Sequence, residues 1–368
     1  MKMVKNLLFI LLPALLLAQS LDIPTSKFGL SIGNSKSFSG LRINWSDRQV
    51  KNIKGIYLTL WKAKDNREAV VKGISLGLLM PEARELYGLQ AGLVGVSAEK
   101  KMVGLNLGLL GSGAGNSMLG INFGGLGVGS GNKISGISVA GVGLAAGKEL
   151  KGLAVAGFGL GAGESFNGLG IAGFGLGAGK SLKGVTISGF ASGAGQSMSG
   201  IHLAGFGLGA GQDVKGIHIA GFGVGAGNDL VGLQAALFGV GAGGSIEGVS
   251  IAGFGLGAGQ KLRWLNVAGI GIGATEIEGL SLAGLFLGGK SVKGITLTPG
   301  LIKIPEKGML KGFGLSSINW NKGSQVGISL SLINYAKNLH GLQIGLLNYA
   351  GNNPKWLQAL PLLNFNFN

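Results

Sequence analysis

A glycine followed by an apolar residue recurs every sixteen residues through the middle of the chain, and this repeat limits the fold more than any other feature. The spacing is constant from Gly104 to Gly248, and Trp264 stands at the next equivalent position. Less regular copies begin at Gly40, Gly55, Gly73 and Gly88 upstream and at Gly279, Gly294, Gly312, Gly327 and Gly341 downstream. Because arrays grow by adding copies, the repeat predicts one array over most of the chain.

The core unit reads G-I-x-I-A-G-F-G-L-G-A-G-x-x-L-x, and one copy is GIHIAGFGVGAGNDLV. Its first half alternates as a strand does, with Ile217 and Ile219 on one face and His218 on the other. The alternation changes phase at Ala220-Gly221, where two small residues let the chain bend. The polar pair after the last glycine indicates a turn. Each unit is therefore predicted to form two short strands joined by a corner and a turn.

These units favour an all-β fold, namely a β-solenoid with one coil per repeat. The large apolar side chains of both strands are expected to point inward. Equivalent residues of successive coils should then stack at the strand spacing of roughly 4.8 Å. One expected interior ladder is aromatic: Phe158, Phe174, Phe190, Phe206, Phe222, Phe238 and Phe254. Another is aliphatic: Ile171, Val185, Ile201, Ile217, Leu233 and Val249.

A transmembrane β-barrel with one strand per repeat is the alternative, because a membrane strand of about 9–11 residues plus a turn has a similar length. The C-terminal residues Phe365 to Asn368 and the high mean hydropathy favour a barrel. Two observations count against it. Neither face of the unit is polar, and all core copies share one turn pattern, whereas successive turns of a barrel face different compartments. The solenoid is the preferred interpretation.

The first twenty residues have the pattern of a secretory signal peptide. Lys2 and Lys5 precede an apolar stretch, and Ala18-Gln19-Ser20 predicts cleavage after Ser20, with cleavage after Ala18 as the alternative. The regularity of the copies then divides the chain. The predicted segments are 1–20 (signal peptide), 21–103 (divergent N-terminal capping repeats), 104–278 (glycine-rich core repeats) and 279–368 (divergent C-terminal repeats and cap).

Composition excludes several classes of protein. Glycine accounts for 76 of 368 residues, but not at every third position, so a collagen helix is excluded. The chain has no cysteine, which excludes disulfides and thiolate metal sites. The formal net charge of +16 favours anionic partners. Arginine is scarce and aromatic residues do not interleave with the basic ones, which argues against nucleic acid.

The sequence offers no constellation suited to catalysis. Its acidic residues are scattered over turns, and no serine stands in a nucleophile motif with histidine and aspartate. The Gly-x-Gly-x-Gly strings lack the following helix and the Gly-Lys-Ser/Thr of nucleotide loops. His202 and His218 share one repeat position, expected to face outward, but two ligands are too few for a metal site. We expect no catalytic residue, cofactor, nucleotide or metal.

Basic residues recur at the last position of the repeat. In a stack of coils they would line one edge with positive charge, which protects the edge and also suits an anionic glycan. This expected basic edge consists of Lys151, Lys183, Lys215, Arg263 and Lys293.

Residues 326–353 read VGISLSLINYAKNLHGLQIGLLNYAGNN. This pattern resembles the GLQIGLxNxA repeats of the bacterial surface-repeat proteins first noted in leptospires and widespread in Gram-negative bacteria. The core copies resemble a glycine-rich variant of that unit, with glycine in place of the asparagines at Asn334 and Asn348. The resemblance covers most of the chain. It implies an envelope or surface location but no activity, and it assigns no functional residue.

These observations predict an exported, non-catalytic envelope protein of a Gram-negative bacterium, in the outer membrane, at the cell surface or in the periplasm. Its expected role is structural or interactive, with anionic envelope polymers or the outer membrane as partner and no nucleic acid. The barrel alternative would make it an outer-membrane scaffold or pore. Self-association stays open.

Overall fold

A computed structural model describes residues 20–367 of the chain. Almost all of the predicted signal peptide, residues 1–19, lies outside the described residues. The chain divides into two compact units at Gly179, and each is described by itself below. Unit 1 here means residues 20–179 and unit 2 means residues 180–367. No helix within residues 20–367 is long and apolar enough to cross a membrane.

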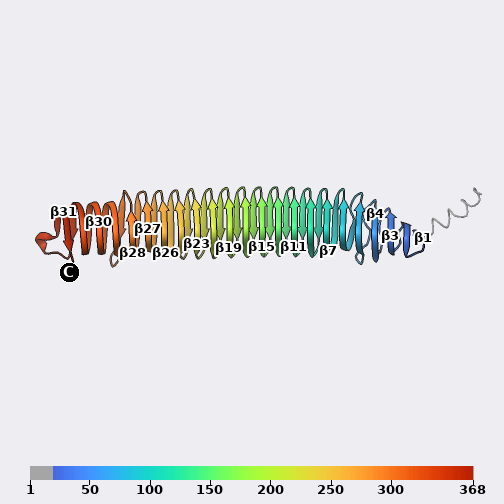
Figure 1. Ribbon diagram of the computed structural model, residues 1–368, viewed down its shortest axis with the longest axis horizontal. Coiled ribbons are helices and arrows are strands. Elements are labelled where there is room, and N and C mark those ends of the chain that lie inside the picture. Colours follow the sequence, from blue (N-terminus) through green and yellow to red (C-terminus); the bar gives the residue numbers. More distant parts are fainter. Residues whose placement is uncertain (1–19, 368) are drawn as a thin grey trace, which may run out of the picture. The chain divides into compact units, whose positions relative to one another are not determined.

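Both units consist of β-strands joined by short turns (Figure 1). The strands of unit 1 are β1 (Ser20–Pro24), β2 (Phe28–Gly33), β3 (Ser37–Asn44), β4 (Asn52–Thr59), β5 (Val70–Gly77), β6 (Glu82–Gly92), β7 (Gly95–Gly108), β8 (Gly111–Ala114), β9 (Ser117–Gly124), β10 (Gly127–Ser130), β11 (Lys133–Ala140), β12 (Gly143–Ala146), β13 (Glu149–Ala156), β14 (Gly159–Ala162), β15 (Ser165–Ala172) and β16 (Gly175–Ala178).

Unit 2 has the same alternation of long and short strands up to Ala252, then mostly longer strands, and one turn of 3-10 helix before its last strand. Its elements are β17 (Ser181–Ser188), β18 (Ala191–Ala194), β19 (Ser197–Ala204), β20 (Gly207–Ala210), β21 (Val214–Ala220), β22 (Gly223–Ala226), β23 (Leu230–Ala236), β24 (Gly239–Ala242), β25 (Ile246–Ala252), β26 (Gly255–Ala268), β27 (Gly271–Ala283), β28 (Phe286–Leu297), β29 (Leu301–Ile304), β30 (Met309–Ala350), η1 (Lys355–Leu357) and β31 (Ala359–Asn366).

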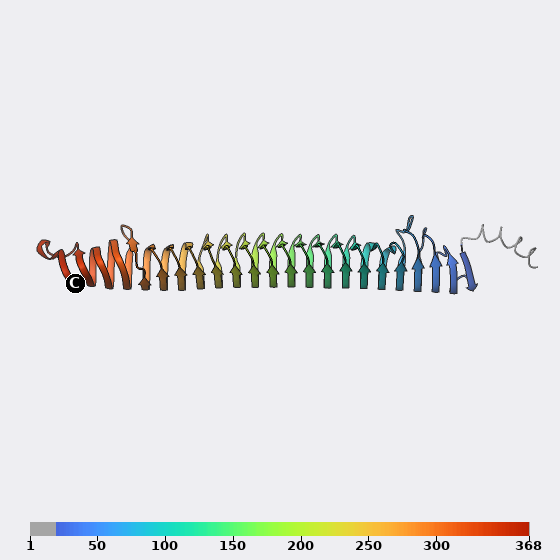
Figure 2. The same ribbon diagram turned by 90° about the horizontal axis from the view of Figure 1, so that it is seen from above.

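Each regular coil contains one long and one short strand, as β13 and β14 illustrate. The strands of one coil pair in parallel with those of the next, sixteen residues further along the chain: Leu150 pairs with Phe166 and Leu160 with Leu176. Figure 2 shows this stacking from a second direction. The predicted all-β solenoid is confirmed. The barrel alternative is wrong, because each repeat supplies two strands and successive repeats pair in parallel rather than as an antiparallel meander.

The glycine that opens each repeat has a structural reason. Gly152 has φ +103, a region that L side chains rarely adopt, and a Cβ there would collide with the carbonyl oxygen of Gly136 in the preceding coil. The equivalent glycines begin at Gly29, one short coil earlier than the sequence pattern indicated, and run to Gly341. A positive φ and close backbone approach together require glycine.

The direction of the side chains corrects the sequence analysis. In β21, His218 is 0% exposed, whereas Ile217 and Ile219 are 39% and 44% exposed. The variable position of the repeat therefore points inward and the two aliphatic positions point outward. The predicted aliphatic ladder lies outside, and its member Ile171 occupies the second aliphatic position rather than the first. A strand alternates with period two, so an error of one residue in phase exchanges its faces.

The core of the coil is narrow, which explains why the aliphatic positions lie outside and the variable position inside. In the coil around β13, the inward side chains are Leu150, Ala154, Ala156, Leu160 and Ala162, all buried. Alanine occupies the inward positions that end both strands, beside the corners, where the coil closes on itself. The large outward residues of the unit have no room inside, so a leucine from each strand fills the core.

Each end of the array carries an antiparallel strand. In unit 1, β1 pairs antiparallel with β2, and in unit 2, β31 pairs antiparallel with β30. An unpaired sheet edge is a template for aggregation, and each of these antiparallel strands covers part of the edge of the last parallel coil. The terminal coils thus act as caps, although the exact segment boundaries predicted from the sequence stay predictions.

Candidate interaction surface

The outward side of each long strand carries two rows of apolar residues without a polar interruption. We call these two rows, with the corner row that follows, the apolar face. In unit 1 the two rows over the regular coils are Leu105, Ile121, Ile137, Leu153 and Leu169, and Leu107, Phe123, Val139, Val155 and Ile171. In unit 2 they are Val185, Ile201, Ile217, Leu233, Val249, Leu265, Leu280 and Ile295, and Ile187, Leu203, Ile219, Ala235, Ile251, Val267, Leu282 and Leu297.

A third apolar row follows at the corner between the long and the short strand. In unit 1 it is Val94, Leu110, Leu126, Val142, Phe158 and Phe174, and in unit 2 it is Phe190, Phe206, Phe222, Phe238, Phe254, Ile270 and Leu285. The predicted aromatic ladder forms within each unit, with ring centroids of Phe206 and Phe222 4.7 Å apart. However, the rings lie outside the coil: Phe158 is 58% exposed. The prediction of an interior aromatic ladder was therefore wrong in its direction.

Apolar hollows lie at the apolar face within the described residues, among them the following three. One of about 540 Å³ in unit 1 lies beside Leu93 and Leu109, where Ala91 leaves room in the second row. One of about 540 Å³ in unit 2 is lined by Leu282 and Leu297 with Pro299. The third, about 740 Å³, has outward glycines of β20, β22 and β24 as its floor and phenylalanines of the corner row beside it.

The exposed apolar area is large for a protein in water. The corner-row phenylalanines and the outermost aliphatic residues of unit 2 are about two-fifths exposed. Side chains of this size then present on the order of 1,000 Å² in that unit, compared with roughly 300–600 Å² for the largest patch of a typical monomer. Exposed apolar surface of that extent marks an interaction site.

The predicted basic edge is present at the surface but largely neutralised. Its members lie one residue before the positive-φ position, next to the first apolar row. Lys151 in unit 1 pairs with Glu149 at 3.0 Å, and its hydrogen bond lowers the pKa of that carboxyl. In unit 2, Lys215 lies 3.8 Å from Asp213, and Lys183 is exposed.

The remaining two members share carboxylates. Arg263 contacts Glu247 at 3.1 Å and Glu278 at 3.3 Å, and Lys293 contacts Glu278 at 3.3 Å. The hydrogen bond from Lys293 lowers the pKa of Glu278. From Glu247 to Lys293 this repeat position therefore alternates in sign rather than presenting continuous positive charge.

Sequence reasoning missed a polar row inside the coils. It occupies the variable position and is fully buried: Arg42, Tyr57, Ser75, Gln90, Asn106, Asn122 and Ser138 in unit 1, and Thr186, His202, His218, Gln234, Ser250, Asn266, Ser281 and Thr296 in unit 2. Some neighbours bond from coil to coil: Asn106 Nδ2 donates to Asn122 Oδ1 at 2.7 Å. Other polar atoms of the row, including both ring nitrogens of His218, have no hydrogen-bond partner among the described residues. The sequence carried a signal for this row, because most residues at the variable position are polar and can hydrogen-bond to a residue of the same type in the next coil.

The two histidines belong to this row, so the prediction that they face outward was wrong. Thr186 Oγ1 and His202 Nδ1 share a hydrogen bond of 2.6 Å, and the rings of His202 and His218 stack with centroids 5.1 Å apart. Burial lowers the pKa of His202. Burial first, and then the charge of His202, lowers the pKa of His218 to about 4. Among residues 20–367 no three His, Cys, Asp or Glu gather as metal ligands would.

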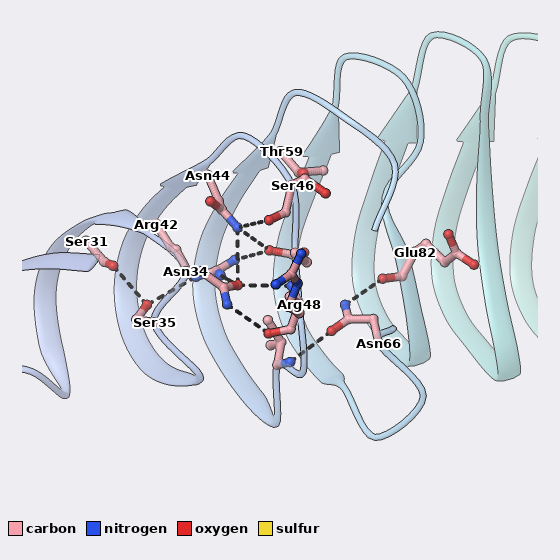
Figure 3. A network of polar contacts seen from close by, with 12 residues as sticks. Ser31, Asn34, Ser35, Arg42, Asn44, Ser46, Arg48, Thr59, Asn66 and Glu82 are labelled. Atoms are coloured by element: carbon pink, nitrogen blue, oxygen red, sulfur yellow. Dashed lines mark hydrogen bonds and ion pairs between the residues drawn. The ribbon is translucent and has the colours of Figure 1, made fainter. Parts of the chain in front are cut away.

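The first coils of unit 1 hold a denser polar network, drawn in Figure 3. The fully buried Arg42 pairs with Asp47 at 2.7 Å and donates to Ser35 Oγ at 3.1 Å. Asn44 Nδ2 also donates to Asp47, at 2.8 Å. A buried ion pair is tolerated only when such bonds satisfy both partners. The network therefore holds the irregular loops of these coils in one arrangement.

Comparisons with known proteins add no relative: no family model, no curated protein and no solved structure matches this chain. The resemblance to the surface-repeat proteins therefore stays a prediction from the residues.

Proposed function

We propose that this protein is an exported, non-catalytic repeat protein of the bacterial envelope that lies against an anionic lipid surface through its apolar face. The observation that carries the proposal is the three-row apolar exposure within each unit. The sequence supports the cellular setting, through the signal-peptide pattern and the resemblance of residues 326–353 to envelope repeat proteins.

Lipid suits the apolar face better than a second copy of the chain does. The three hollows at the apolar face have volumes of about 540–740 Å³. Flexible acyl chains can fill such hollows, whereas a second rigid sheet would leave voids, which protein interfaces avoid. The net charge of +16 is complementary to anionic headgroups, because each nearby lysine or arginine adds attraction.

Vesicle flotation tests this proposal. The full mature chain is mixed with phosphatidylglycerol-containing vesicles, with phosphatidylcholine vesicles or with no vesicles, and the floating fraction is measured. We expect flotation with anionic vesicles and weaker flotation with phosphatidylcholine. The triple variant Phe206→Ser, Phe222→Ser, Phe238→Ser should bind more than about tenfold more weakly, because each phenylalanine side chain contributes over 1 kcal/mol when buried.

The matched control changes three exposed turn residues of nearby coils in unit 2: Gln196→Ser, Gln212→Ser and Asn228→Ser. This control should float like the unmodified chain, and circular dichroism should show the same strand content for both variants. Absence of flotation would refute the proposal. A discrete dimer in light scattering that is lost in the phenylalanine variant, without flotation, would assign the apolar face to a second copy.

A further inference from the structure

A fourth hollow differs from the three apolar hollows described above in being polar. It measures about 440 Å³ and lies among the loops before β3, β4 and β5 in unit 1, where the repeat is irregular. Its lining residues are Lys36, Gln49, Lys51, Asp65, Arg67 and Glu68. Figure 2 shows loops that stand out from the coils in this region.

The loops around this hollow are held in place by buried amide contacts. Asn66, which is buried, accepts from the Val50 N–H at 3.0 Å and donates to the Glu82 carbonyl at 2.9 Å (Figure 3). The Gln49 N–H donates to the Asp65 carbonyl at 2.8 Å, which joins the two loops directly. The shape of the hollow is thus fixed by hydrogen bonds between the loops that form it.

Two of its residues have a costly backbone conformation. Gln49 has φ +53 and Asp65 has φ +108, neither being glycine. Such conformations are strained and concentrate at binding sites and active sites. Here they place the Gln49 and Asp65 side chains at the same hollow.

The charges at the hollow lack protein partners. Three cations, Lys36, Lys51 and Arg67, share it with Asp65 and Glu68. Within residues 20–367, none of these five forms an ion pair within 4.0 Å. Both the donors and the acceptors are therefore available to a ligand.

We propose that this hollow binds a sugar unit that carries a carboxylate or a phosphate. The cations match the anionic group, since charge-assisted hydrogen bonds are the stronger ones. The carboxylates of Asp65 and Glu68 and the Gln49 amide accept from ring hydroxyls. A volume of about 440 Å³ lies within the range of roughly 300–1,000 Å³ of ligand sites. A bare inorganic anion would leave the two carboxylates without donors.

The site is separate from the apolar face, and it supplies the specific anionic contact that the basic edge does not. Isothermal titration calorimetry on the full mature chain tests it with galacturonate, galactose 6-phosphate, galactose and inorganic phosphate as probes. We expect the sugar acid, the sugar phosphate or both to bind, and galactose and phosphate to bind at least about tenfold more weakly. The comparison of the first two identifies the anionic group.

The variant Lys51→Gln, Arg67→Gln should lose binding by at least about tenfold. Lys62→Gln, an exposed lysine of the same loop outside the hollow, should not. Both variants should still float with anionic vesicles, which separates this site from the proposed membrane contact. The inference is overturned if neither sugar binds, if galactose or phosphate matches them, or if the two variants behave alike.

Discussion

The positive-φ position of the coil shows how strictly one residue can be specified. The glycines at this position have φ values between +103, at Gly152, and +150, at Gly341. Within the described residues Trp264 replaces one of them, with φ +82 and 73% exposure. Its neighbours in the series are Gly248 and Gly279. A bulky residue at positive φ is strained.

Restoring the repeat should therefore stabilise the protein. We expect Trp264→Gly to raise the free energy of unfolding by about 1 kcal/mol, because glycine relieves the positive-φ strain. Thermal unfolding followed by circular dichroism measures the change. The converse variant Gly248→Ala should lower the midpoint, since its Cβ would collide with the Gly232 carbonyl. An unchanged or lower midpoint in Trp264→Gly would show that the indole contributes more than the strain costs.

At the scale of the element, each long strand places one variable residue inside and two aliphatic residues outside. The result is a polar row in the core and an apolar face toward the surroundings, the reverse of a water-soluble sheet. Parallel stacking stabilises this arrangement in part, because several buried polar residues hydrogen-bond to a polar residue in the next coil. Asn122 Nδ2, for example, donates to Ser138 Oγ at 3.0 Å.

The buried histidine pair should make unit 2 sensitive to acid. The pKa of His218 is about 4 in the folded chain and about 6.5 in the unfolded chain. Protonation therefore favours the unfolded state, and stability that is present above pH 6.5 is lost as the pH falls toward about 4. The loss amounts to about 3 kcal/mol.

Urea unfolding between about pH 4 and 7 checks this expectation. His218→Gln, which copies Gln234 of the next coil, should lose less stability on acidification than the unmodified chain. His340→Gln removes an exposed histidine and should keep the original dependence. Equal slopes in all three proteins would contradict a role for His218.

At the scale of the whole molecule, the solenoid is held by contacts between residues about sixteen positions apart, and caps protect its ends. The N-terminal cap begins at the predicted cleavage site of the signal peptide. β1 pairs Leu21 with Ile32 and Pro24 with Gly29, so a chain that begins at Leu21 still retains the capping strand. The predicted cleavage site and the structural start of the array are compatible.

Expression of the whole chain in a Gram-negative host should therefore yield a mature protein that starts at Leu21. Intact mass spectrometry of the cell-envelope fraction measures the N-terminus. A start at Gln19 would support the alternative site after Ala18. A full-length mass would contradict the signal peptide and with it the proposed export.

The candidate sites were partly visible in the sequence. The aromatic row was found through the constant spacing of its phenylalanines, and its stacking within each unit followed from one coil per repeat. Its exposure was missed, as was the hollow beside Lys51 and Arg67. That hollow is formed by irregular loops that Asn66 joins through hydrogen bonds. The repeat period carries no information about contacts between such loops.

The sequence by itself determined an all-β repeat fold, the length of its unit and the offset of sixteen residues between equivalent positions, and it favoured a solenoid over a barrel. Only the tertiary structure decided which face of the strand is inside. The alternation of residues shows that a strand has two faces, but it does not show which face is buried. The narrow corners hold small residues, mostly alanine with serine at Ser130 and Ser188, and this steric limit turns Ile217 and Ile219 outward and buries His218.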